Sequence, residues 1–441
     1  MVALNLARFR IQYDKVKSVL VVCPPSLILN WHYTIQELTE YNSLPLIGTR
    51  DNKVFKINKD YMFNVISYDS LPPIKRKGKK NSDVHNELLN KQYDMIIYDE
   101  SSRYIRSPET NRTKAAIKLS DQAKYRMILT GSPIADNPLN LWSQFRALDY
   151  GVLFGRNYYV YRSLFFEKDE RIHRWFLKPK YYKVIKNKIA DVCIQFSKDE
   201  CLKDMPESVF QTIKLGFTPE GRQDYLELKT KVIAEIETEL GKANVNVQHA
   251  FQKLVRLQQF TSGYTKDEYG EEKRLKETPK LDALIDELQG VIEEKNSAIV
   301  WCKFRFSINM IEEELRKLKI KYLTMHGDTR DKYAAWKGFQ QSREHKVFIG
   351  QIVSGGIGIE LFKLEDTEKN SQYTFFYEND WVPDVRLQAT GRPNRIGQKA
   401  RTLFYKDLVL EKTIDEYILQ TISDKKKVID SLVNLDLKTV L

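Results

Sequence analysis

Two arginines set three positions apart carry the strongest chemical signal in this chain. They lie in Gln388-Ala-Thr-Gly-Arg-Pro-Asn-Arg-Ile-Gly-Gln398, where Arg392 and Arg395 follow a glycine. On a helix or in a tight turn, this spacing puts both guanidinium groups on one side. Such a pair suits a triphosphate whose γ-phosphoryl group gathers charge as it leaves. Taken alone, the segment could also be a helix end with two solvated arginines.

A pair of acids is the second chemical feature. Asp99 and Glu100 directly follow the apolar run 95–98. If that run is a strand of a parallel sheet, the acids lie at its carboxyl edge, where open α/β folds bind ligands. One carboxylate there can hold Mg²⁺ through water, and the next can orient or deprotonate an attacking water. A solvated turn is the alternative interpretation of an isolated Asp-Glu pair.

Short apolar runs alternate with amphipathic stretches at both ends of the chain. The first series of expected strands is 18–23, 63–67, 95–98 and 126–129, and the second is 298–302, 321–325, 346–349, 373–377 and 402–405. Continuous apolar character suits parallel strands that are covered on both faces. Helical patterns lie between them, for example at 308–318 and 331–339. The alternation predicts two α/β domains with parallel sheets.

The expected domains are residues 1–150 and 278–441, with a mainly helical insertion at 151–277 between them. Residues 219–239 and 245–259 are expected to form long helices of this insertion. The stretch 157–188 is dense in Tyr, Phe, Lys and Arg. It could add phosphate contacts, together with the basic run Lys75–Lys80, or form a subdomain with an aromatic core and solvated lysines.

Composition narrows the partners and the compartment. The net charge of +12 and the pI near 9.1 favour a polyanion such as nucleic acid. The four cysteines show no Cys-x-x-Cys spacing, and Cys23 and Cys302 lie in apolar runs as buried small hydrophobes. We therefore expect a reducing compartment, cytoplasmic or nucleoid/nuclear, and not a secreted protein. The apolar runs are shorter than the roughly 18 residues of a membrane span, so no membrane partner is expected.

Several segments occur in an order that resembles a known motif series. They are Asp94-Met-Ile-Ile-Tyr-Asp-Glu100, Leu129-Thr-Gly-Ser-Pro133, Met325-His-Gly-Asp328, Ser354-Gly-Gly-Ile-Gly-Ile-Glu-Leu361 and the arginine segment. Together they resemble superfamily-two helicase-like ATPases. The final Arg-Ile-Gly-Gln, and Trp381-Val-Pro383 before it, resemble the Swi/Snf-like branch. The resemblance extends from about Val19 to about Leu419, nearly the whole chain.

This resemblance implies an α/β fold of two RecA-like domains with a mainly helical insertion. The implied activity is that of a DNA-dependent ATPase motor that translocates on double-stranded DNA and remodels protein–DNA or branched DNA structures. The implied cofactors are ATP and Mg²⁺, with Asp99 holding the metal through water. Asp99, Glu100, Arg392 and Arg395 would be catalytic.

The same resemblance implies further site residues. Nucleotide-binding residues would be Asp99, Arg392 and Arg395 together with Gly356, Gly358 and Gln388. Coupling residues would be Thr130 and Ser132, whose hydroxyls could bond across to the acid pair. Nucleic-acid contacts would come from Ser26, Lys303 and Arg305. Ser26 lies in Pro24-Pro-Ser-Leu-Ile-Leu-Asn-Trp31 and is expected to be an N-cap, with Trp31 as a packing residue. The segment Val65-Ile-Ser-Tyr68 resembles the next motif of the family that contacts the nucleic-acid strand.

The chain also departs from the family pattern. Ser101-Ser102 stands where the family has Ala-His or Ser-His, and Glu360 replaces the usual Asn. The 441 residues contain no Gly-x-Gly-Lys-Thr loop, the family's first motif, and residues 1–10 resemble the helix that follows that loop. A truncated start, a split chain whose partner supplies the lysine loop, and a degenerate ATPase are the explanations, of which the first two are favoured.

We therefore expect weak ATP binding and little DNA-stimulated ATPase activity from this polypeptide alone. A non-catalytic nucleic-acid-binding fragment, or half of a split helicase that needs a partner chain, is the alternative function. A motor part of a restriction or phage-replication complex is a third possibility.

Overall fold

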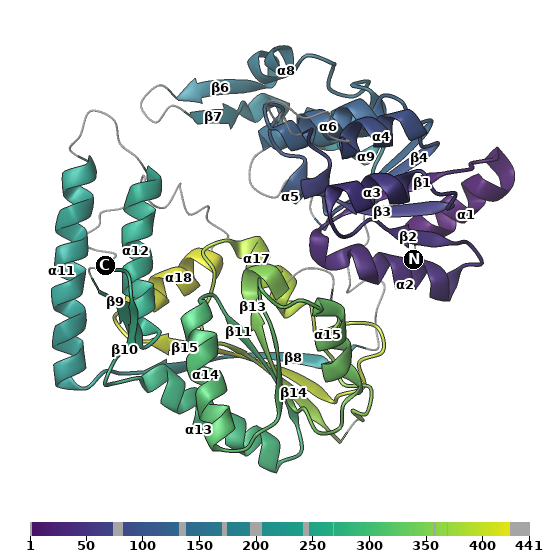
Figure 1. Cartoon of the computed structure of the whole chain (residues 1–441). Coiled ribbons are helices and arrows are strands. Elements are labelled where there is room, and N and C mark those ends of the chain that lie inside the picture. Colours follow the sequence, from purple (N-terminus) through teal and green to yellow (C-terminus); the bar gives the residue numbers. More distant parts are fainter. Residues whose placement is uncertain are drawn as a thin grey trace. The chain divides into compact units, whose positions relative to one another are not determined.

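The computed structural model describes residues 2–73, 83–131, 138–169, 174–194, 205–240, 247–267, 269–355, 359–367 and 369–423. The chain divides into two units, Met1–Phe196 and Ser197–Leu441 (Figure 1). Each unit contains its own sheet and is described by itself.

The first unit contains a five-stranded sheet in the order β2-β3-β1-β4-β5, and every pairing in it is parallel. Its strands are β1 (Val19–Cys23), β2 (Ser43–Pro45), β3 (Phe63–Ser67), β4 (Met95–Asp99) and β5 (Tyr125–Leu129). The helices are α1 (Val2–Asp14), α2 (Ile28–Leu38), α3 (Arg50–Ile57), α4 (Val84–Lys91), α5 (Ser101–Tyr104), α6 (Asn111–Ser120), α7 (Leu141–Asp149), α8 (Tyr158–Phe165) and α9 (Tyr182–Ala190). A separate antiparallel pair is formed by β6 (Phe166–Asp169) and β7 (Arg174–Leu177).

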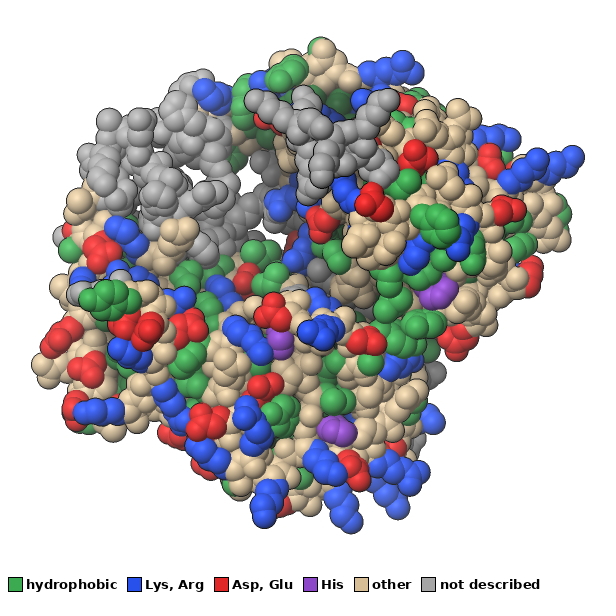
Figure 2. All heavy atoms as spheres, in the orientation of Figure 1, with side chains coloured by type: hydrophobic (Ala, Val, Ile, Leu, Met, Phe, Trp, Pro, Cys, Tyr) green, Lys and Arg blue, Asp and Glu red, His purple; other side chains and the backbone are tan. Residues whose placement is uncertain are grey.

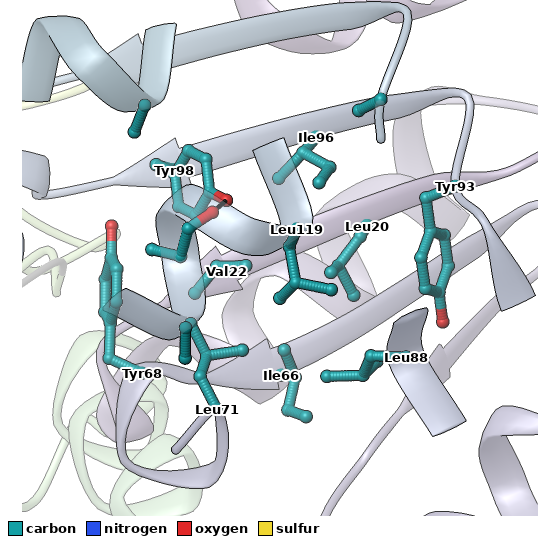
Figure 3. Packing of buried hydrophobic residues seen from close by; sticks show 14 of the residues in the cluster. Leu20, Val22, Ile66, Tyr68, Leu71, Leu88, Tyr93, Ile96, Tyr98 and Leu119 are labelled. Carbon is teal, nitrogen blue, oxygen red and sulfur yellow. Dashed lines mark hydrogen bonds between the residues drawn. The ribbon is translucent and has the colours of Figure 1, made fainter. Parts of the chain in front are cut away.

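Alternate residues of these strands build a core beneath the helices. Leu20, Val22, Ile66 and Ile96 pack with Leu88 and other apolar residues of α3, α4 and α6. Figure 3 shows this cluster with the Tyr68 ring at one end and the Tyr93 ring at the other. Burial of the strand residues fixes the register and so fixes which residues emerge at the carboxyl edge.

The second unit contains a six-stranded parallel sheet in the order β12-β13-β11-β14-β15-β8. Its strands are β8 (Glu207–Leu215), β11 (Ser297–Cys302), β12 (Tyr322–Met325), β13 (Val347–Gln351), β14 (Ser371–Phe376) and β15 (Thr402–Leu410). The helices are α11 (Pro219–Leu240), α12 (Val247–Thr261), α13 (Pro279–Glu293), α14 (Arg305–Lys317), α15 (Lys332–Gln341), α16 (Ile352–Gly355), α17 (Pro383–Thr390) and α18 (Ile414–Ser423), and β9 (Tyr264–Lys266) pairs with β10 (Glu272–Arg274).

Both faces of this sheet are covered. Ala298, Val300 and Cys302 of β11 pack in one cluster with residues of α13 and α14. Ile299 and Trp301 of the same strand pack in another cluster with residues of α15 and α17. The continuous apolar runs of the sequence arise from this double burial.

The predicted fold class, with two parallel α/β sheets, is confirmed. Cys23 and Cys302 are buried, as expected. The expected insertion contains its two long helices, α11 and α12, but residues 207–215 form strand β8 at the edge of the second sheet. The division near residue 196 also falls inside the expected insertion, and the boundaries at 150 and 277 stay predictions. In the described ranges, no helix combines the length and apolarity of a membrane span.

Candidate functional site

The acid pair lies at the carboxyl edge of the first sheet, because Asp99 is the last residue of β4 and Glu100 follows it. Both side chains are half-buried. One carboxylate oxygen of Asp99, Oδ1, accepts the backbone N–H of Glu100 at 3.0 Å. The predicted position at a strand end is therefore observed, although the catalytic role stays a prediction.

Glu100 adopts a left-handed backbone, with φ of 53°. This conformation lets the chain leave β4 and begin α5 at the next residue. For a residue other than glycine it costs about 1–2 kcal/mol. Strain of this kind at a strand end is common at functional sites, because neighbouring packing has to maintain it.

Two aromatic residues hydrogen-bond to Asp99 from distant segments. The indole Nε1 of Trp31, on α2, donates to Asp99 Oδ2 at 2.9 Å. The hydroxyl of Tyr68 donates to the Asp99 carbonyl at 2.8 Å. Tyr68 is fully buried, and burial raises the pKa of its phenol well above its ordinary value. The sequence-based interpretation of Trp31 as a packing residue missed this polar contact.

Thr130, which directly follows β5, reaches the segment after the acid pair. Its hydroxyl donates to Ser102 Oγ at 2.7 Å, and Ser102 stands where the family has histidine. The neighbouring Ser101 is fully buried and donates to Gln144 Oε1 at 3.0 Å. Ser132, the other predicted coupling residue, lies outside the described residues.

Ser26 lies in a 3₁₀ turn, Pro25–Leu27, directly before α2. The prediction that Ser26 is an N-cap was wrong: Leu27 holds that position for α2 and Pro24 holds it for the 3₁₀ turn, and neither start has a side-chain cap. The cause is that the 3₁₀ turn runs directly into the helix and moves the start upstream. A phosphate contact by Ser26 stays a prediction.

In the second unit, Arg392 is tied to the segment that follows the glycine loop. Its carbonyl accepts the backbone N–H of Leu361 at 3.0 Å, and its Nη1 donates to the Ile359 carbonyl at 3.4 Å. Arg392 is 3% exposed. Two segments that sequence reasoning assigned to nucleotide binding therefore lie together within this unit.

Buried glutamines hold the turn that carries the arginines. Gln398 Nε2 donates to the side chain of Gln372 at 2.5 Å and to the Pro393 carbonyl at 3.2 Å. Gln372 in turn donates to the Leu361 carbonyl at 2.7 Å. Because Gln372 is the second residue of β14, this arginine turn (residues 391–397) lies beside the amino end of that strand.

Other predicted nucleotide contacts are placed only in part. Gln388 is half-buried on α17. Arg395 is half-buried too, and its Nε is enclosed without a hydrogen-bond partner among the described residues. Gly356 and Gly358 lie outside the described residues.

Lys303 and Arg305 follow β11 and have different surroundings. The amine of Lys303 donates to Gln258 Oε1 at 2.9 Å and lies 3.8 Å from Asp380 Oδ2. Burial lowers its pKa, while Asp380 acts in the opposite direction. Arg305 is exposed in the first turn of α14. Arg305 is therefore accessible to a phosphate, whereas Lys303 is already engaged within the unit.

Sequence reasoning also missed Glu378, which follows β14. This buried carboxylate accepts the backbone N–H groups of Lys303 and Phe304 at 2.6 and 3.2 Å and the hydroxyl of Ser307. Burial raises its pKa. It satisfies free donors at the start of α14 and so fixes the backbone beside Arg305.

The aromatic stretch 157–188 contributes a core. Tyr161, Phe165 and Phe166 pack with Trp142, Phe145 and Phe154 of the same unit. Its lysines Lys183 and Lys186 are exposed on α9. The aromatic core matches one of the two interpretations, and phosphate contact by these lysines stays a prediction. Figure 2 shows basic and acidic side chains interspersed on the visible face, without a single basic stripe.

The residues present fit the implied nucleotide and metal. Mg²⁺ usually keeps several waters and takes one or two protein carboxylates plus phosphate oxygens. Asp99 supplies such a carboxylate, whose oxygens accept the indole N–H of Trp31 and the backbone N–H of Glu100. The enclosed Nε of Arg395 is a donor that a phosphate oxygen can satisfy.

Parallel sheets, acids at a strand end and a buried arginine turn are features of helicase-like ATPases. The SNF2-related domain matches residues 2–263, more than half of the chain, and the chain belongs to this family. Some predicted site residues lie beyond the matched range, so the match itself says nothing about the arginine turn.

Curated relatives include an uncharacterized ATP-dependent helicase of Mycoplasma genitalium, 23% identical over 95% of this chain and 38% of its own length. The TATA-binding protein-associated factor MOT1 of Saccharomyces cerevisiae is 23% identical over 96% of this chain and 25% of its own length. The chain thus spans less than two fifths of these relatives. Among solved structures, the Sulfolobus solfataricus SWI2/SNF2 ATPase core in complex with dsDNA has a TM-score of 0.41 at 20% identity, covering 99% of this chain and 87% of that chain.

Proposed function

We propose that this chain is the motor core of an ATP-dependent, Swi/Snf-like translocase that moves on double-stranded DNA and remodels protein–DNA or branched DNA structures. The observation that carries the proposal is the fixed arginine turn, in which Arg392 bonds the segment after the glycine loop through both backbone and side chain. Membership of the SNF2-related family and the acids at the end of β4 support it.

In this proposal the two units act on one nucleotide. Glu100 orients and deprotonates the attacking water, and Asp99 holds Mg²⁺ through water. Mg²⁺, when bound, neutralises charge on the phosphate oxygens. Arg392 and Arg395 stabilise the charge that develops on the γ-phosphoryl group, while Gln388 and the glycines Gly356 and Gly358 contact the nucleotide. Thr130 and Ser132 link the acid segment to the rest of the unit.

Ser26 and Arg305 contact the DNA backbone in the proposed complex. Lys303 supports that contact indirectly, because its amine is held by Gln258. Binding to phosphates releases counterions, so affinity falls steeply as salt rises. The net charge of +12 favours the same partner.

The test measures duplex binding by fluorescence anisotropy and ATP hydrolysis with and without duplex, in parent and Arg392→Ala chains. Hydrolysis that duplex stimulates and that Arg392→Ala abolishes, with unchanged duplex affinity, supports the motor. Duplex binding without ATP binding supports the alternative, a nucleic-acid-binding fragment or half of a split helicase. In the latter case a partner chain with a Gly-Lys-Thr loop restores hydrolysis.

A further inference from the structure

A direct hydrogen bond joins a segment expected to contact nucleic acid to the expected metal-binding acid. Trp31 lies in the first turn of α2, three residues after Ile28 begins that helix. Its indole Nε1 donates to Asp99 Oδ2 at 2.9 Å, across 68 residues of sequence. The 3₁₀ turn that contains Ser26 leads without interruption into the same helix. A displacement of this turn therefore moves Trp31 as well.

A second hydrogen bond to Asp99 comes from Val65–Tyr68, the next segment that is expected to contact the nucleic-acid strand. Tyr68 follows β3, and its hydroxyl donates to the carbonyl of Asp99 at 2.8 Å. Its ring stacks on Tyr104, with centroids 4.6 Å apart and planes inclined by 4°. Tyr68 thus holds the main chain of Asp99, whereas Trp31 holds the side chain.

The two oxygens of the Asp99 carboxylate accept donors of different kinds. Oδ1 accepts the N–H of Glu100, which lies on the same strand end, and Oδ2 accepts the indole of Trp31 from α2. Two donors on the two oxygens fix the rotation of the carboxylate about its Cβ–Cγ bond. Because the Trp31 donor belongs to another element, movement of α2 changes the direction in which the carboxylate points.

We propose that Trp31 is a positioning residue that couples nucleic-acid contact at the start of α2 to the orientation of Asp99. The inference deepens the proposed function and rests on it. In this scheme duplex binding to residues 24–27 shifts α2, the indole turns the carboxylate, and hydrolysis accelerates. Trp31 itself touches neither the nucleotide nor the DNA.

Fluorine NMR of the chain labelled with 5-fluorotryptophan tests this directly. Trp31→Phe identifies the Trp31 resonance by its loss. Asp99→Asn is expected to shift that resonance and to leave Trp142 unmoved. Trp142 is a matched control in the same unit, because its indole donates to the Gly155 carbonyl at 3.0 Å and not to a carboxylate. A short DNA duplex is expected to shift Trp31 and not Trp142.

A rate measurement adds a second readout. With a partner chain that supplies the lysine loop, Trp31→Phe is expected to lower the factor by which duplex stimulates ATP hydrolysis by about tenfold, since a hydrogen bond to a charged group is lost. Its duplex affinity, measured by anisotropy, is expected to stay within about twofold of the parent, because no phosphate contact is removed. Trp142→Phe is expected to leave the stimulation unchanged.

The outcomes separate this inference from the proposed function. A chain that binds duplex while the Trp31 resonance stays fixed overturns the relay and leaves the motor proposal intact. A Trp31 resonance that does not shift in Asp99→Asn also overturns the relay, because the hydrogen bond from Trp31 to Asp99 is then absent in solution. A chain that binds no duplex overturns the proposed function and the relay together.

Discussion

In the first unit, Asp99 accepts hydrogen bonds from side chains on α2 and after β3, whereas in the second unit Arg392 is held by bonds to backbone groups of Ile359 and Leu361. The acid site also includes a left-handed glutamate, and the arginine turn is fixed by buried glutamines. The acid site is thus strained and tied to α2 and the segment after β3 through side chains, while the arginine turn is held by backbone groups and buried glutamines. The comparison suggests that the acids respond to partners and the arginines provide a fixed counterpart.

The largest expected effect comes from removing the proposed base. With a partner chain that supplies the lysine loop, Glu100→Gln is expected to lower single-turnover ATP hydrolysis at saturating duplex by about 10²–10⁴-fold, because proton transfer to a positioned carboxylate is lost. Single-turnover conditions detect slow hydrolysis. Glu109→Gln, an exposed glutamate of the same unit, is the control and is expected to change nothing. Equal rates for Glu100→Gln and the parent would contradict the catalytic role.

A buried ion pair in the second unit gives the next effect. Arg386, on α17, donates to both oxygens of Asp407, and their side chains are 10% and 8% exposed. Asp407→Ala leaves the guanidinium buried without its carboxylate partner, with Asn379 Oδ1 still accepting from Nη1, and is expected to cost about 3–5 kcal/mol of unfolding free energy. Because α17 leads into the arginine turn, the same variant is expected to weaken ATP binding.

The matched control is a similar pair in the first unit. Arg146 donates to both oxygens of Asp121 at 2.7 and 3.0 Å, but the Asp121 side chain is 40% exposed. Asp121→Ala is expected to cost no more than about 1 kcal/mol, because solvent screens the pair. Calorimetry of both variants measures the difference. Equal costs would mean that burial does not distinguish the two pairs.

A smaller effect is expected from Asp366, whose Oδ2 is buried without a partner among the described residues. Burial raises the pKa of this carboxyl to about 6. The folded pKa thus lies above the unfolded value of about 3.9. The stabilisation that comes from protonated Asp366 is therefore fully present in the unfolding free energy below about pH 3.9, and it is lost as the pH rises through about 6.

Asp366→Asn is therefore expected to remove this pH dependence and to raise unfolding free energy at pH 7 by up to about 3 kcal/mol. Urea unfolding at several pH values between 4 and 7 measures it. Glu365→Gln, next in sequence and paired with Lys346, is the control and is expected to lose stability instead. A parent protein whose stability does not fall over this pH range would refute the assignment.

The smallest effect concerns the strain at Glu100. Glu100→Gly is expected to raise unfolding free energy by about 1 kcal/mol, because glycine adopts a positive φ without penalty. Glu109→Gly is a suitable comparison, because Glu109 has no positive φ and is expected to lose stability through chain entropy. Denaturant titration of the first unit's transition measures both. A destabilised Glu100→Gly would argue against stored strain.

Much of the fold could be predicted from apolar runs. Strand 63–67 was placed to the residue, and 95–98 was one residue short of β4. Strand β8 was missed, although Val209, Ile213 and Leu215 alternate with Ser208, Thr212 and Lys214. An edge strand buries one side only, so its pattern is weak, and its place inside a region rich in helices concealed it.

The candidate site could be predicted from the sequence only where its residues lie at the end of a single strand. Asp99 and Glu100 follow directly from β4, but the bond from Trp31 crosses 68 residues and has no signature in spacing. The sequence places Gln398 in a motif, but it does not predict the side-chain hydrogen bond to Gln372 that gives Gln398 a structural role. Long-range hydrogen bonds depend on tertiary packing, which local patterns do not encode.

The pairing of β8 with β15 has a practical consequence for producing the second unit alone. Nine residues of β15, Thr402–Leu410, are matched by Glu207–Leu215. A shortened polypeptide that starts at residue 278 would expose this strand as a bare ribbon of backbone donors and acceptors, which invites self-association. A polypeptide that starts at residue 205 keeps β8 paired with β15 and is the better choice for crystallisation.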